Sequence, residues 1–166
     1  VGGLLLDGWN NLNGSAANTL TVRSGTKLQM NSFQNLYPVG WTLALVTNST
    51  VSISAGSGSG YNVWSGPVTL TGSAILSPSS GCSATFTNAL SGNGAVIVNN
   101  AGTIYLSGLT NTYTGTTIVS NGTLYAQSAG SLPGHDVAGK VSVLSNATLA
   151  VYASADVQKG WDQDHI

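Results

Sequence analysis

The chain has 166 residues, of which 42% are hydrophobic and only 5% are charged, and its net charge is −1. An ordinary globular chain carries about 25% charged residues. So little charge excludes attraction to nucleic acid or to an anionic membrane surface, and so much apolar content excludes a disordered chain. No apolar run approaches the roughly 20 residues of a membrane-spanning helix, so we expect no membrane insertion by this segment.

The composition favours strands over helices. Glu is absent, Met occurs once and Lys and Arg together occur four times, so the good helix formers are scarce. Ser, Thr, Asn and Gly must then keep the chain soluble, and these residues favour strands joined by turns. The sequence therefore predicts an all-β protein. Its single cysteine, Cys82, is expected to be a buried thiol, with an intermolecular contact as the alternative.

Short runs of alternating apolar residues recur along the chain, and each pair of runs is separated by a polar corner. The predicted strand pairs are 20–22 with 28–30, 43–45 with 51–53, 96–98 with 104–106, and 141–143 with 149–151. The segments 31–41 and 54–67 have no such pattern and are predicted to be loop insertions on the outside of the fold.

Aligning these runs gives a repeat. The positions treated as equivalent are Leu20, Leu43, Val68, Val96, Thr117 and Val141, and the steps between them are 23, 25, 28, 21 and 24 residues. A repeat of this length is typical of a solenoid. We therefore expect a parallel β-helix, or β-solenoid, with turns of about 24 residues over residues 1–155, and a polar tail or junction at 156–166. The alternative is an antiparallel β-sandwich, because Asn121-Gly122 between two alternating runs is also a strong hairpin signal.

Asparagine occurs at several of the predicted corners, namely at Asn48, Asn100, Asn121 and Asn146. Asparagine tolerates the left-handed backbone that a sharp corner needs, and stacked turns would place the side chains above one another. The sequence thus predicts a ladder of hydrogen-bonded amides. Glycosylation is a second possibility, because Asn13, Asn48, Asn121 and Asn146 each begin an Asn-X-Ser/Thr sequence.

Three aromatic residues, Trp41, Tyr61 and Trp64, lie in or beside the predicted insertions. They either pack against the solenoid or form stacking platforms for a surface glycan. The second interpretation would make the chain a carbohydrate-binding adhesive module.

Catalysis has few candidate residues. Glycoside hydrolysis normally requires two carboxyl groups at a defined separation, and the sequence contains only five carboxylates. Asp136 and Asp156 are about one turn apart and could stack beside His135, but solvated loop residues are the simpler interpretation. Residues 42–131 carry no charge at all, which leaves them without metal ligands or a base. We expect no catalytic site, metal site or cofactor, and a polysaccharide-degrading enzyme is the least favoured alternative.

The segment 91–134 reads SGNGAVIVNNAGTIYLSGLTNTYTGTTIVSNGTLYAQSAGSLPG. It resembles the autotransporter-associated β-strand repeat. The matching residues are Gly102, Thr103, Leu106, Ser107, Gly108, Asn111, Thr112, Tyr113, Thr114, Gly115, Thr117, Val119, Gly122, Thr123 and Leu124. The resemblance implies a right-handed parallel β-helix from a large, secreted or surface-exposed bacterial protein that acts as a stalk, an adhesin or an extracellular fibre.

The leading functional expectation is a non-catalytic structural module that assembles head to tail, with copies of itself or adjacent repeat modules as its partners. Exposed strand edges pair with other strands unless charge or a covering segment blocks them. The first predicted strands lack a polar cap, whereas the tail carries Trp161, Asp162, Asp164 and His165. We expect these four residues to form the assembly junction; a cation site at the last three is a weaker alternative.

Overall fold

The computed structural model describes residues 2–6, 16–31, 39–55, 59–108, 110–153 and Trp161. This part of the chain forms sixteen strands and one short 3-10 helix, η1 (Ala129–Ser131). In chain order the strands are β1 (Gly3–Leu6), β2 (Thr19–Val22), β3 (Lys27–Asn31), β4 (Thr42–Leu45), β5 (Ser49–Ser54), β6 (Gly60–Trp64), β7 (Val68–Leu70), β8 (Ala74–Pro78), β9 (Cys82–Phe86), β10 (Leu90–Gly92), β11 (Val96–Val98), β12 (Thr103–Leu106), β13 (Thr117–Val119), β14 (Gly122–Ala126), β15 (Val141–Val143) and β16 (Ala147–Val151).

The strands form three sheets in which every pairing is parallel. Sheet A has the order β1-β3-β5-β8-β11-β13-β15, sheet B has the order β2-β4-β7-β10, and sheet C has the order β6-β9-β12-β14-β16. A full turn of the chain passes through sheets B, A and C in succession, and about six turns stack at a spacing of about 23 residues. The predicted parallel β-solenoid is confirmed, and the antiparallel sandwich is excluded.

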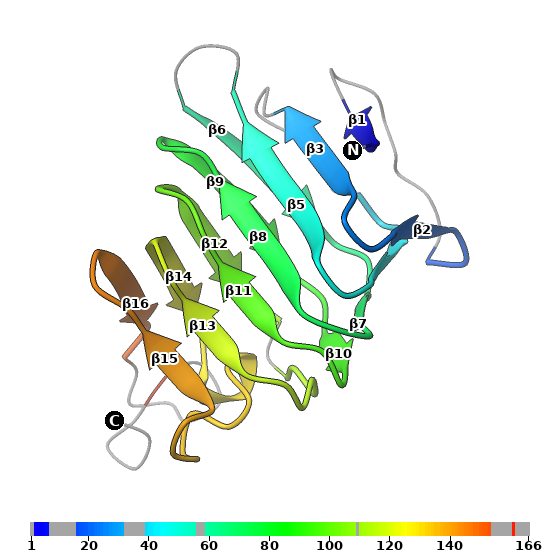
Figure 1. Ribbon diagram of the computed structural model, residues 1–166. Helices are drawn as coiled ribbons and strands as arrows, with labels where there is room; N and C mark the ends of the chain where they lie inside the picture. The colour runs from blue at the N-terminus through cyan, green and yellow to red at the C-terminus, as the bar shows by residue number, and fades with distance from the viewer. Residues whose placement is uncertain are drawn as a thin grey trace.

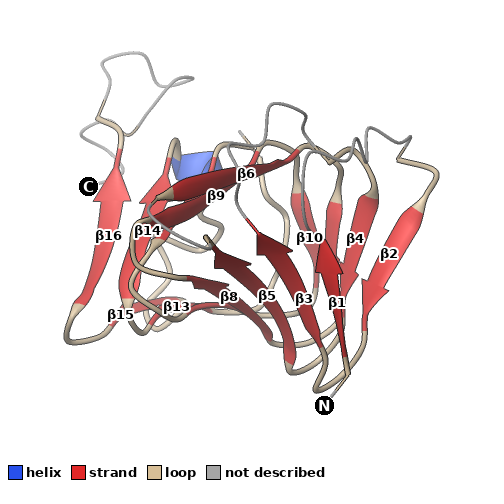
Figure 2. Ribbon diagram, turned by 90° about the horizontal axis from the view of Figure 1, so that it is seen from above, coloured by secondary structure: helices blue, strands red, loops and turns tan. Residues whose placement is uncertain are grey.

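The three sheets enclose a common interior, and the stack has two distinct ends (Figures 1 and 2). Strands β1 and β3 lie near the N-terminal end, and β15 and β16 lie at the opposite end (Figure 1). Sheet A runs from β1 to β15, whereas sheet B ends at β10 and sheet C begins at β6.

A complete turn contains three strands rather than the two that the sequence analysis expected, and this changes the alignment of the repeat. Leu20, Leu43 and Val68 are register partners in sheet B, as expected. The next partner of Val68, however, is Leu90 and not Val96. Val96 lies in sheet A and pairs with Thr117. The expected 28-residue step was wrong because it moved from one sheet to the next.

The segment 54–67 is also different from the expectation, because it contains β6 (Gly60–Trp64) of sheet C. Strand β6 pairs with β9 over five residues, so residues 60–64 belong to the coil and not to an external insertion, while residues 56–58 lie outside the described part of the chain. In the other predicted insertion, 31–41, residues 32–38 lie outside the described part of the chain. Val39 forms a parallel bridge with Trp64 and so continues sheet C toward the N-terminal end.

Alternate residues of the strands point into the interior, and in the turns between the two ends these residues are buried. One inward column in sheet A consists of Leu28, Val51, Leu76, Val98, Val119 and Val143, which are register partners in successive turns. All of these except Val143 are at most 2% exposed. Burial of such a side chain contributes about 1.5–3 kcal/mol, so the interior supplies most of the stability. Cys82 is free and buried, which confirms the predicted thiol.

The corner between sheets B and A contains a column of glycines, Gly72, Gly94 and Gly115. A Cβ atom on Gly94 or Gly115 would overlap the backbone of the glycine in the preceding turn, and a Cβ atom on Gly72 would overlap Thr47. Only glycine allows the backbones to approach this closely, so this column fixes the spacing of the turns at one corner.

Candidate assembly surfaces at the ends of the solenoid

The C-terminal end of the stack leaves inward-facing residues uncovered. Val119 is 0% exposed because β15 lies over it, whereas its partner Val143 in β15 is 44% exposed. Leu149 and Val151 in β16 are only partly buried, although their partners in β14 are completely buried. The interior therefore opens to solvent at β15 and β16.

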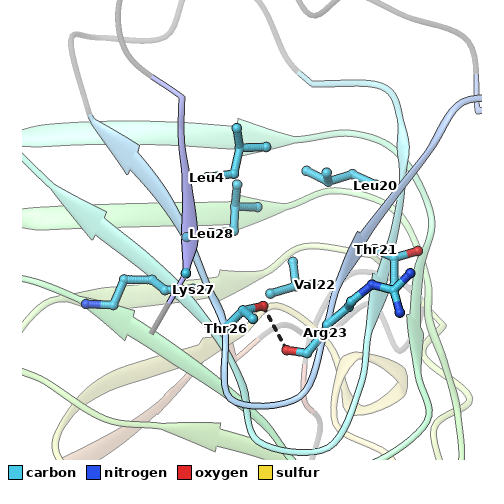
Figure 3. Close-up of a pocket in the computed structure, with 10 residues that line it drawn as sticks. Leu4, Leu20, Thr21, Val22, Arg23, Thr26, Lys27 and Leu28 are labelled. Carbon is cyan, nitrogen blue, oxygen red and sulfur yellow. Dashed lines mark hydrogen bonds between the residues drawn. The ribbon is translucent and has the colours of Figure 1, made fainter.

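The N-terminal end is open as well, and it contains a cavity of about 210 Å³ between β1, β2 and β3. Figure 3 shows Leu4 and Leu28 pointing toward Leu20 and Val22 across this cavity. Leu4 is 46% exposed although its register partner Leu28 is buried. The cavity is the open end of the apolar interior.

Two cations lie beside this N-terminal cavity. Arg23 and Lys27 both line it, and both side chains are exposed. Figure 3 shows the Lys27 side chain extending away from the leucines, and the Thr26 hydroxyl donating a hydrogen bond of 2.8 Å to the carbonyl oxygen of Arg23. The N-terminal end thus combines an apolar centre with a positively charged rim.

The last strand of sheet B, β10, is covered by the buried side chain of Asn111 and not by a further strand of the sheet. The Asn111 Oδ1 accepts a hydrogen bond of 2.8 Å from the backbone N–H of Leu90, and its Nδ2 donates one of 2.6 Å to the carbonyl oxygen of Ser131. Asn111 therefore joins β10 below to η1 above, in the place where a regular ladder would use backbone groups. Since Asn111 is 6% exposed, water cannot replace these bonds readily.

The 3-10 segment that covers Asn111 is held by buried serines. The Ser131 hydroxyl donates a hydrogen bond of 2.9 Å to the carbonyl oxygen of Gly108 and accepts one of 3.2 Å from the Ser128 backbone N–H. This network was not predicted from the sequence. The sequence signal for it is the NTYTG phrase at 111–115, which is part of the family resemblance.

Tyr113 is the second buried residue of this phrase. Backbone hydrogen bonds from Thr112 and Thr114 to the preceding turn place it beside Gly92, and it is 1% exposed. Its hydroxyl forms a hydrogen bond of 2.6 Å with the Thr117 hydroxyl. Burial raises the pKa of Tyr113 to about 12, and the Thr117 hydrogen bond offsets part of this rise. Tyr113 is therefore a neutral core residue.

Trp161 also belongs to the core and not to an exposed junction. It is 4% exposed, and its indole Nε1 donates a hydrogen bond of 3.1 Å to the carbonyl oxygen of Ala126. Its ring meets the His135 ring edge to face at 4.8 Å between centroids. The expectation that Trp161 contacts a neighbouring module was wrong, because the side chain is buried in its own chain. The other expected junction residues, Asp162, Asp164 and His165, lie outside the described residues.

Three of the four corner asparagines adopt the expected backbone; at the fourth, Asn121, the following Gly122 has the positive φ angle, 76°. Asn48, Asn100 and Asn146 have positive φ angles of 61°, 101° and 69°. Asn48 lies between sheets B and A, whereas Asn100, Asn121 and Asn146 lie between sheets A and C, so the four do not form one column.

Their side chains cap the corners locally. Asn100 Oδ1 accepts a hydrogen bond from the N–H of Ala101 and Asn121 Oδ1 accepts one from the N–H of Gly122, at 2.9 Å and 2.8 Å. Within the described part of the chain, these bonds replace the predicted amide-to-amide ladder. Among the possible glycosylation sites, Asn48 and Asn146 are exposed, Asn121 is partly buried and Asn13 lies outside the described residues.

Trp41, Tyr61 and Trp64, for which packing and a glycan platform were the two alternatives, differ in their exposure. Trp64 is an inward residue of β6 and is 1% exposed, and its indole donates a hydrogen bond of 2.9 Å to the carbonyl oxygen of Trp41. Trp41 is partly buried, and its own indole nitrogen is shielded from solvent. Only Tyr61 is exposed, at 42%. The packing interpretation is therefore correct for Trp64.

Asp136 is exposed, and Asp156 lies outside the described residues. No group of three His, Cys, Asp or Glu side chains gathers anywhere in the described ranges. Over the same ranges, no helix is long and apolar enough to cross a membrane.

No protein-family model, curated protein or solved structure matches the chain.

Proposed function

We propose that this chain is a non-catalytic structural module of a bacterial extracellular fibre, stalk or adhesin, and that it makes head-to-tail contacts through the two ends of its solenoid. Its partners would be further copies or adjacent repeat modules, placed at the cell surface or outside the cell. The resemblance of 91–134 to autotransporter-associated repeats supports this location. An uncharged surface of Ser, Thr and Asn is compatible with it.

The observation that carries the proposal is the exposure of inward-facing residues at both ends. Leu4 and Val143 occupy positions that are buried in the interior turns, and among the described strands those that carry them have a neighbour on one side only. Edges of this kind pair with further strands unless charge or a covering segment prevents it. The two ends are also different surfaces, so contacts between them are heterologous and extend into a filament when they do not close a ring.

The test places a charge on one end. Val143→Lys puts an ammonium group on the open end of the interior, where the side chain is exposed enough to reach solvent. Ser142→Lys is the matched control, because Ser142 is the adjacent residue of β15 but lies on the outer face. We expect sedimentation and electron microscopy to show concentration-dependent linear assemblies for the unmodified chain and the control, but not for Val143→Lys.

The same comparison applies at the other end, with Leu4→Lys as the test and Leu5→Lys as the outward-facing control. The proposal is wrong if the unmodified chain stays monomeric at high concentration, or if both inward variants assemble as it does. Deleting residues 159–166 would be a poorer test, because it removes Trp161 from the core.

A further inference from the structure

The outer face of sheet C carries an unusual share of the aromatic residues. Four of the five tyrosines that the structure describes lie on it: Tyr61, Tyr105, Tyr125 and Tyr152. The fifth, Tyr113, is buried. This clustering was not apparent from the sequence, since these four residues are spread over more than 90 positions.

The strand register defines three outward columns on this face. The first contains Tyr61, Ser83, Thr103, Thr123 and Thr148, and the second contains Val63, Thr85, Tyr105, Tyr125 and Ala150. The third continues the backbone ladder beyond the strands and contains Ser65, Thr87, Ser107, Gln127 and Tyr152. None of these fifteen residues is charged and none is fully buried.

The tyrosines follow a diagonal path across the face. Tyr61 and Tyr152, at its two ends, are 42% and 51% exposed. Between them, the rings of Tyr105 and Tyr125 are 5.4 Å apart and tilted by 45°. Both of these central side chains are partly exposed. Four strand spacings separate β6 from β16, so the path extends roughly 19 Å in the direction perpendicular to the strands.

We propose that the outer face of sheet C binds an uncharged polysaccharide chain, with the four tyrosines as stacking platforms and the flanking hydroxyls as hydrogen-bonding groups. A neutral sugar presents apolar C–H faces and hydroxyl edges, and this face offers aromatic rings beside Ser and Thr hydroxyls that can donate and accept. The inference does not depend on head-to-tail assembly, since the face runs along the side of the solenoid and not across its ends.

The chemistry of the face distinguishes this ligand from others. Anionic glycans and nucleic acids would require Arg or Lys, and the described cations Arg23, Lys27 and Lys140 all lie outside the three columns. A second copy of the chain would suit the outer face of sheet A better, because Ile75, Ile97 and Ile118 form an aliphatic column there.

Affinity gel electrophoresis tests the proposal, with hydroxyethyl cellulose, glucomannan and dextran as neutral probes and polygalacturonate as the anionic probe. The test variant is Tyr105→Ser with Tyr125→Ser. Its matched control is Ile97→Ser with Ile118→Ser, which changes two register partners on the outer face of sheet A. We expect at least one neutral probe to retard the unmodified chain and the control, and the tyrosine variant to bind about tenfold more weakly.

Thermal unfolding checks that both variants fold. If the central pair proves necessary for folding, Tyr61→Ser with Tyr152→Ser replaces it, because these exposed residues can be changed without opening the core; it too should weaken binding. The proposal is overturned if no neutral probe causes retardation, if only polygalacturonate does, or if folded tyrosine variants bind as the unmodified chain does. It is also overturned if the tyrosine variants abolish a side-by-side dimer and not glycan binding.

Discussion

At the scale of single residues, polar side chains in the interior complete the backbone ladder where the strands stop. Asn111 occupies the position at which residues Leu43, Val68 and Leu90 place apolar side chains in earlier turns of sheet B. Its amide supplies the acceptor for the Leu90 N–H and the donor for the Ser131 carbonyl. The fold therefore tolerates a polar residue at this core position, because both the oxygen and the nitrogen of the side-chain amide have hydrogen-bond partners.

We predict that Asn111→Ala lowers the free energy of unfolding by about 2–4 kcal/mol, because it leaves one buried donor and one buried acceptor without partners. Urea denaturation would measure the change. Asn88→Ala is the matched control: Asn88 also bridges two turns, through a 3.1 Å bond to the Ser65 carbonyl, but it is exposed. Water can replace that bond, so we expect a loss below about 1 kcal/mol. Equal losses in the two variants would contradict the argument.

At the scale of strands, the cost of a core substitution depends on whether a further turn covers the position. Val98 and Val143 are the same residue type in one inward column of sheet A, yet they are 0% and 44% exposed. The alternation of the strand is the same in both cases. The difference is that β13 covers Val98, whereas no described strand covers Val143.

We predict that Val98→Ala lowers the free energy of unfolding by about 2–3 kcal/mol, and that Val143→Ala lowers it by less than about 1 kcal/mol. Chemical denaturation of the isolated chain gives both values. A large loss for Val143→Ala under dilute conditions would show that another segment covers β15, which would also weaken the proposed assembly surface.

At the scale of the whole molecule, each turn contacts only its neighbours. The stability of a solenoid is then approximately a sum over turns and their interfaces, and the turns at the ends have one interface instead of two. Strands β1 and β16 are edge strands in this sense, whereas β11 and β12 lie between neighbours on both sides.

We predict that backbone amides exchange with solvent deuterium in an order that follows position along the stack. The amides of Val98 and Ile104 should be among the slowest, and those of Leu4 and Val143 among the fastest, because the ends open without unfolding the centre. Hydrogen exchange followed by NMR or mass spectrometry measures this order. Uniform protection throughout would show that the chain unfolds as one cooperative unit.

The sequence by itself determined the type of structure. Its spacing of about 24 residues, its alternating apolar runs and its lack of helix formers were sufficient to predict an all-β solenoid. The corner asparagines were predicted to tolerate a left-handed backbone, and Asn48, Asn100 and Asn146 do adopt it. These features are local, since strand alternation and corner conformation depend on neighbouring residues in the chain.

Only the tertiary structure decided which residues lie side by side. Alternation distinguishes the inside of a strand from its outside, but it is the same on all three sheets, and so Val68 and Val96 were aligned although they lie in different sheets. The burial of Trp64 and Trp161, the bridging role of Asn111 and the row of tyrosines on sheet C depend on the turns above and below them. Contacts between turns follow the register of the stack. Because the corners vary in length, this register cannot be read from the spacing of residues in the sequence.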